Sequence, residues 1–183
     1  DAFVAGGNDV TDGVDRNTAG NHLGSYNMAL SYVSPEWKTR AYFERYFEDQ
    51  SMLTLQYGIY DHLLGFEVEL PKNPFVNSFV LEHISTKDQS GAVYHDKTAS
   101  MPDKMNGRDN YYYHLLYTGW QHWGMALGHP LITSPIYNEN NVINFRNNRI
   151  MAWHFGLNGQ PTDELTYRVL LTFTENWGTY ITP

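Results

Sequence analysis

The 183-residue sequence contains no cysteine, which excludes disulfide frameworks and thiolate metal sites. It also has no excess of basic residues, because 12 Lys and Arg stand against 20 Asp and Glu, for a formal net charge of −8. A chain without a basic stripe to neutralise phosphates is not expected to bind nucleic acid.

Long apolar segments are also missing. No apolar run reaches about 18 residues, so no helix is expected to cross a membrane. The strands of a membrane β-barrel would escape this test, because half of their residues are polar. The chain opens at Asp1 without a recognisable export signal, and we expect it to be a portion of a longer protein.

What the sequence does contain is alternation, most clearly in a stretch that Ser34 and Pro35 interrupt. Before the interruption, the apolar positions are Tyr26, Met28, Leu30 and Tyr32. After it, they are Trp37, Thr39, Ala41, Phe43 and Phe47. Charged and polar residues fill the positions between them. Side chains on a strand alternate between faces, so we predict a hairpin with one apolar face and one charged face. Arg45 is the exception on the apolar face, and we expect it near the end of its strand.

The rest of the chain repeats this pattern, with further strands expected at about 64–70, 75–85, 148–157 and 165–174. Short turns are expected at 71–74 and 158–161, and long loops at about 1–21, 48–62 and 86–142. Short turns alternating with long outer loops are typical of transmembrane barrels. The prediction is an all-β fold in which residues 1–183 form one portion, of about six strands, of an antiparallel transmembrane β-barrel. A soluble antiparallel β-sandwich is the alternative.

Candidate ligand-binding residues lie in the expected loops, where aromatic rings stand beside hydrogen-bonding groups. A saccharide site needs this combination, because a flat ring covers the C–H face of a sugar while amides and carboxylates bind its hydroxyls. The candidates are Asp49, Gln50, Asp88, Gln89, Tyr94, His95, Asp96, Asn110, Tyr111, His114 and Trp120. The structural alternative is that the Asp and Gln residues bond to local backbone and that the aromatic residues pack a loop plug.

Catalytic and metal-binding motifs are weak. No HExxH, GxSxG or phosphate-binding glycine loop is present. Paired carboxylates such as Glu67 and Glu69, or Glu44 and Glu48, suggest a glycosidase, in which two carboxyl groups lie about 5 to 9 Å apart; residues two apart on a strand are about 6.6 Å apart. Charges of both signs on neighbouring strands instead favour a structural ladder inside a barrel. We therefore expect no enzyme and no cofactor. Among metals, Ca²⁺ held by loop oxygens is the most compatible with the composition.

Several short blocks of sequence occur in an order that is similar to one known family. They are Ala19-Gly20-Asn21-His22-Leu23-Gly24-Ser25, Arg45-Tyr46-Phe47-Glu48-Asp49-Gln50-Ser51, Lys87-Asp88-Gln89-Ser90-Gly91, Asp109-Asn110-Tyr111-Tyr112-Tyr113-His114, and Gly119-Trp120 followed by Gly128-His129-Pro130. Together, over about residues 19–135, these blocks resemble the capsule assembly Wzi family of gram-negative outer membranes.

The resemblance implies an outer-membrane β-barrel that holds or organises capsular polysaccharide at the cell surface, in a lectin-like role without catalysis. Six strands are too few for the smallest usual barrel of about eight, so other chain segments are expected to complete it. The expected partners are capsular or other surface polysaccharide and outer-membrane lipid. A barrel predicts that the Tyr26, Met28 and Leu30 face is bare, whereas a soluble glycan-binding or glycan-cleaving sandwich predicts that a second sheet covers it.

Overall fold

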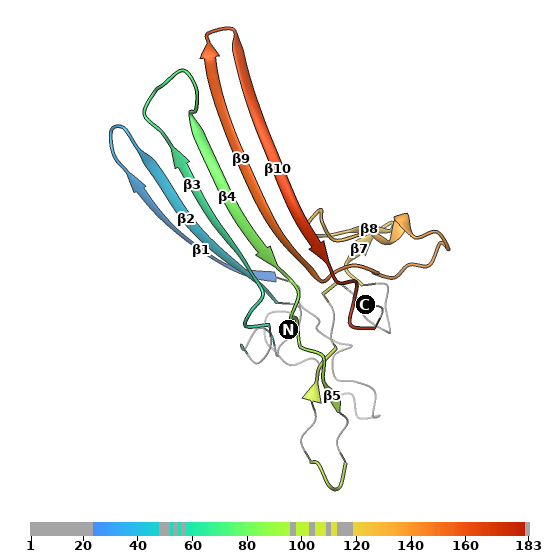
Figure 1. Cartoon of the computed structure of the whole chain (residues 1–183). Helices are drawn as coiled ribbons and strands as arrows, with labels where there is room; N and C mark the ends of the chain where they lie inside the picture. The colour runs from blue at the N-terminus through green and yellow to red at the C-terminus, as the bar shows by residue number, and fades with distance from the viewer. Residues whose placement is uncertain are drawn as a thin grey trace.

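The computed structural model describes residues 24–47, 52, 55, 58–95, 98–102, 105–108, 111–112 and 119–181. Their main feature is a curved antiparallel sheet of six strands in the order β1-β2-β3-β4-β9-β10, with the loop regions gathered beyond one end of it (Figure 1). Its strands are β1 (Gly24–Val33), β2 (Lys38–Phe47), β3 (His62–Glu69), β4 (Ser78–Ser85), β9 (Ile150–Thr162) and β10 (Leu165–Asn176). The prediction of an all-β, antiparallel fold is confirmed.

The long connection between β4 and β9 contains two small two-stranded sheets. They are formed by β5 (Tyr94–His95) with β6 (Met105–Asn106) and by β7 (Gln121–His122) with β8 (Met125–Ala126). A short 3₁₀ helix, η2 (Pro135–Tyr137), follows. In the described part of the chain no helix is long and apolar enough to cross a membrane.

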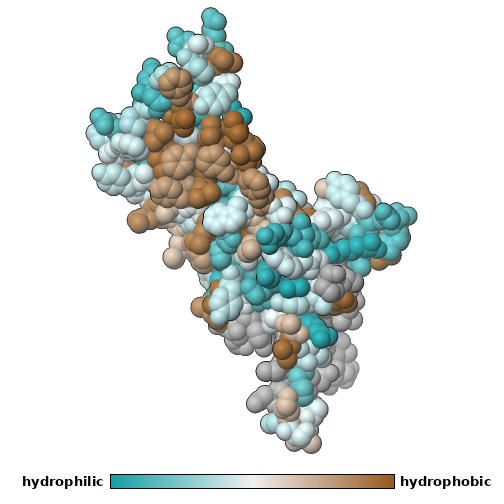
Figure 2. Space-filling view, viewed as in Figure 1, coloured by the Kyte–Doolittle hydropathy of each residue, from teal (hydrophilic) through white to brown (hydrophobic). Residues whose placement is uncertain are grey.

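One face of the large sheet is apolar across all six strands, and we call it the apolar face. The strand registers place these side chains in neighbouring rows: Tyr26, Met28, Leu30, Tyr32, Ala41, Phe43, Leu64, Phe66, Val68, Phe79, Leu81, Trp153, Phe155, Leu157, Val169, Leu171 and Phe173. Figure 2 shows hydrophobic side chains gathered over the strands. Leu30 is 78% exposed and Phe173 is 68% exposed, so no second layer of described residues covers this face.

The opposite face, which we call the polar face, carries the charges of β2, β3 and β4. Lys38 on β2 lies directly opposite Glu69 on β3, and its Nζ is 2.7 Å from the Glu69 Oε2. Arg45 is the one Lys or Arg within the strands on the apolar-face side, and it lies near the end of β2 as expected, opposite Tyr26 and largely buried. His62 and His83 also lie on this side, near the loop end, with the His62 Nε2 3.0 Å from the His83 Nδ1. The alternation predicted from the sequence is therefore confirmed for the first hairpin.

Two of the three short connections were predicted correctly, and one was wrong. The chain turns after β1 at Ser34, whose N–H donates to the Trp37 carbonyl at 2.8 Å, and again between β3 and β4, where Asn73 Oδ1 accepts from the N–H of Val76 at 2.9 Å. The turn expected at 158–161 does not form there, because β9 continues to Thr162 and the chain reverses only before Leu165.

The reason lies in the neighbours of Asn158 and Gly159. The Asn158 carbonyl accepts from the Asn77 N–H at 2.8 Å and its Nδ2 donates to Ser78 Oγ at 2.7 Å, so Asn158 belongs to the β4–β9 ladder. A Cβ at Gly159 would lie 1.8 Å from the carbonyl oxygen of Phe75. The glycine therefore permits a close approach between backbones rather than a turn.

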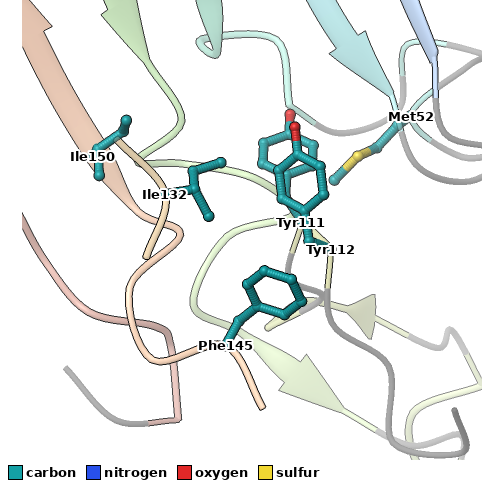
Figure 3. Close-up of a cluster of buried hydrophobic side chains, with 6 residues drawn as sticks. All are labelled: Met52, Tyr111, Tyr112, Ile132, Phe145 and Ile150. Atoms are coloured by element: carbon teal, nitrogen blue, oxygen red, sulfur yellow. The ribbon is translucent and has the colours of Figure 1, made fainter. Parts of the chain in front are cut away.

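A small hydrophobic core lies at the loop end of the sheet. Figure 3 shows its side chains, with the rings of Tyr111 and Tyr112 near the centre of the cluster: Met52, Tyr111, Tyr112, Ile132, Phe145 and Ile150. Ile150 begins β9 and is fully buried, so this core is continuous with the sheet. The core thereby anchors segments of the long connection against the strand ends.

Candidate functional site

A row of side chains crosses the polar face near its loop end, and we call it the polar row. Residue by residue from β1 to β10 it consists of Ala29, Tyr42, Gly65, Glu82, His154 and Thr172. A Cβ at Gly65 would lie 2.0 Å from the Tyr42 ring, so the ring of Tyr42 lies across the glycine. This lets the Tyr42 hydroxyl donate a hydrogen bond to the Glu82 carboxylate, one strand further on.

A cleft of about 280 Å³ opens beside the polar row. The sheet contributes Leu63, Glu82, Ile84, Ala152, His154 and Thr172, and the long connection contributes His129, Pro130 and Leu131. All six sheet residues belong to the polar face, so segment 129–131 lies over that face. One carboxylate and two imidazoles thus stand beside an apolar floor, a combination found in small-molecule sites.

Neighbouring groups determine which atoms the two histidines present. The Nδ1 of His154 lies 2.7 Å from the Thr172 hydroxyl, and the Nδ1 of His129 accepts from the Leu131 N–H at 3.3 Å. Burial lowers the pKa of His129, and the nearby carboxylates of Glu82 and Glu44 oppose this shift. A neutral His129 that accepts at Nδ1 carries its proton on Nε2, where it is a hydrogen-bond donor.

A second polar cluster organises the loops around the Asp61 carboxylate, which is fully buried. Its oxygens accept from the backbone N–H groups of Asp88 at 2.9 Å and Gln89 at 2.7 Å. Burial raises the pKa of Asp61 to about 6, although these hydrogen bonds favour the charged form. Asp61 therefore ties the start of β3 to the segment that follows β4.

Several residues predicted to bind ligand are part of this scaffold. Gln89 is buried, and its Nε2 donates to the Asn148 carbonyl at 3.1 Å. Tyr111 is buried in the core beside Tyr46. Asp88 is half-buried, and its carbonyl accepts from the Tyr180 hydroxyl at 2.7 Å. We assign Gln89 and Tyr111 structural roles, because neither presents a side-chain surface to a ligand.

The other predicted residues lie elsewhere. Tyr94 and His95 form β5, away from the polar row, and Tyr94 is half exposed. Trp120 is half-buried against the core, and its backbone N–H donates to the Tyr112 carbonyl at 2.9 Å. The remaining predictions fall outside the described residues: Asp49, Gln50, Asp96, Asn110 and His114.

The structure also bears on the metal and glycosidase interpretations. Within the described ranges, no group of three or more His, Asp or Glu residues is placed to hold a metal ion. Glu69 is in an ion pair with Lys38, and Glu67 lies opposite Arg40, as expected for a structural ladder of compensating charges. Glu48 lies outside the described residues.

Sequence reasoning missed the residues of the cleft. Glu82, His154 and Thr172 occupy one row only because of the strand register, and His129 reaches it through a long loop. Only the alternation, which places Glu82 and His154 on the polar side of their strands, carries a signal of this site in the sequence. Comparison of the chain with protein-family models, curated proteins and solved structures finds no match.

Proposed function

We propose that this chain forms part of the wall of an outer-membrane β-barrel whose loop end binds capsular or other surface polysaccharide. The observation that carries the proposal is the uncovered apolar face, which crosses all six strands while charges occupy the opposite face. Soluble monomers rarely expose so extensive an apolar surface, whereas the lipid-facing wall of a barrel requires one.

The height of the apolar face supports this assignment. Trp37 and Phe43 lie six residues apart on or beside β2, which corresponds to about 20 Å along the strand. Trp153 lies in the same cross-strand row as Phe43 and is half exposed. Lipid-facing bands are about 25 Å tall and have aromatic residues at both borders. Trp37 and Trp153 therefore stand where the borders of such a band would be.

The sheet edges support closure by further strands. Among the described residues, the outer edges of β1 and β10 have no neighbouring strand. Each edge strand is long, with 10 residues in β1 and 12 in β10. Long unpaired edges favour aggregation, and closure into a barrel removes them. We infer that additional strands pair with both edges, so that the polar face lines the interior.

Polysaccharide binding is supported by the groups at the loop end. The cleft beside the polar row offers the Glu82 carboxylate and the imidazoles of His129 and His154. Elsewhere in the long connection, Tyr94 exposes an aromatic ring. These groups match the hydroxyls and C–H faces of sugars. The resemblance to the capsule assembly Wzi family points to the same ligand class. The proposed role is binding without a chemical step.

Fluorescence quenching in lipid vesicles tests the proposal. With the protein reconstituted in vesicles, lipids brominated on their acyl chains should quench the emission of Trp37 and Trp153, so that Trp37→Phe and Trp153→Phe each lower the quenched fraction. Trp123→Phe is the matched control, because Trp123 is 86% exposed in the turn between β7 and β8. Equal effects of all three substitutions would contradict a lipid-facing wall.

A further inference from the structure

Two cations stand side by side just beyond the loop ends of β4 and β9. The Lys87 Nζ lies 4.3 Å from the centre of the Trp177 ring, and the Arg149 guanidinium lies 3.8 Å from the centre of the Tyr180 ring. The Arg149 Nε also donates to the Lys87 carbonyl at 2.9 Å, which links the two residues. Each cation is thus held in place by an aromatic ring.

The strand register places this basic pair on the apolar-face side of the sheet. Ser85 lies opposite Met151, and the Trp177 N–H donates to the Arg149 carbonyl at 2.9 Å, so Lys87, Arg149 and Trp177 continue the same rows. The intervening residues point the other way, because Thr86 and Ile150 are buried toward the polar face and the loop core. Lys87 lies four residues beyond His83, about 13 Å along the strand from the last apolar row.

The two ends of the apolar face differ in where their cations lie. At the turn end, the strand cations Lys38, Arg40 and Arg168 all belong to the polar face. At the loop end, Lys87 and Arg149 stand on the outward side, each four residues beyond the aromatic border at Trp153 and its neighbour His83. In a membrane this level corresponds to the headgroups, above the hydrocarbon.

Within the described ranges, neither Lys87 nor Arg149 forms an ion pair with a carboxylate, unlike Lys38, which pairs with Glu69. This is unusual for a chain with a formal net charge of −8, in which acidic residues outnumber basic ones. A half-buried basic pair without a carboxylate partner, framed by two aromatic rings, has the chemistry of an anion site.

We propose that Lys87 and Arg149, with Trp177 and Tyr180, bind the phosphate of an anionic lipid headgroup at the loop-side border of the membrane. The Arg149 guanidinium and the Lys87 ammonium donate to the phosphate oxygens, while the rings of Trp177 and Tyr180 lie at the interface, where such residues are enriched. This inference rests on the proposed membrane location and adds a lipid partner to it.

The test is lipid selectivity in vesicles. The full chain is reconstituted in phosphatidylcholine, and tryptophan quenching by dibrominated phosphatidic acid is compared with quenching by dibrominated phosphatidylcholine of the same chain length. A site of this kind should favour the anionic lipid by roughly fivefold per cation. Lys87→Gln should remove most of this preference. Lys72→Gln, the same charge change in the exposed turn between β3 and β4, should leave it intact.

Arg149→Gln is the second variant, and a circular-dichroism spectrum checks that its strands form. Repeating the quenching measurement with added inorganic phosphate distinguishes binding of a lipid headgroup phosphate from binding of free phosphate. Selectivity that survives inorganic phosphate and falls in Lys87→Gln supports a lipid site, whereas loss of selectivity in phosphate buffer overturns it. Normal quenching of Trp37 and Trp153 without any anionic preference overturns this inference alone, and absence of that quenching overturns the membrane proposal itself.

Discussion

The two faces of the six-stranded sheet alternate residue by residue along the same strands, yet their side chains are stabilised in different ways. On the polar face, side chains bond to each other across strands: Lys38 to Glu69, Tyr42 to Glu82, His154 to Thr172 and Asn158 to Ser78. On the apolar face the contacts are mainly between hydrocarbon groups and rings, such as Phe66 with Phe79.

The difference fits the proposed barrel, in which the two faces have different surroundings. Polar side chains that satisfy one another can line a narrow interior with little water, because their hydrogen bonds do not depend on solvent. The apolar face, by contrast, leaves many of its rings and hydrocarbon groups exposed, as the lipid-facing wall of the proposed barrel would. Substitutions that exchange the character of the faces test this distinction.

The largest effect is expected from Leu81→Arg, which places a charge in the middle of the apolar face. Leu81 is 41% exposed, so in water the substitution would cost little. If the face meets lipid, the charge should lower the free energy of unfolding in vesicles by about 2–4 kcal/mol. Urea unfolding of the reconstituted protein, followed by tryptophan emission, measures this difference.

The control for Leu81→Arg is its neighbour Val80→Arg, which puts the same charge on the polar face, where Val80 lies opposite Glu67. The lipid model predicts a much smaller loss for Val80→Arg than for Leu81→Arg. Similar losses for both variants would mean that the two faces have the same surroundings.

A smaller effect is expected from Gly65→Ala, which disturbs the polar row. The added methyl group would lie 2.0 Å from the Tyr42 ring, so the ring must move and its hydroxyl loses Glu82. We expect a loss of about 1–3 kcal/mol in the free energy of unfolding, as for other overpacked sites. In a Tyr42→Ala background the clash is gone, and Gly65→Ala should then have almost no effect; an undiminished loss would contradict the proposed role of the glycine.

The sequence predicted the faces of the sheet well, because a period of two is a local property. It predicted Met28, Leu64 and Leu171 on one side without knowledge of their neighbours. It failed at Asn158 and Gly159, where an Asn-Gly pair usually marks a turn. There, the approach of the Phe75 backbone decides the conformation, and that contact joins segments far apart in the chain.

The candidate site was less predictable from the sequence, because it also depends on contacts between segments far apart in the chain. Gln89 and Tyr111 have the chemistry of ligand-binding residues, but Gln89 is buried beside the Asp61 carboxylate and Tyr111 is buried in the hydrophobic core. The cleft needs the register of β4 with β9 and the path of segment 129–131, neither of which is encoded in a local pattern. Residue type alone therefore identified plausible groups but could not place them.

The smallest effect is expected from Lys38→Met, which removes the Lys38–Glu69 ion pair while keeping an unbranched side chain of similar length. The side chains of Lys38 and Glu69 are 59% and 53% exposed, so solvent screens their attraction. The free energy of unfolding should fall by about 0–1 kcal/mol, with less effect at high salt. Lys72→Met, in the turn between β3 and β4, gives the matched charge change without this pair. A loss well above that range, absent in Lys72→Met, would show that water is excluded around Lys38 and Glu69 in the vesicle-bound protein.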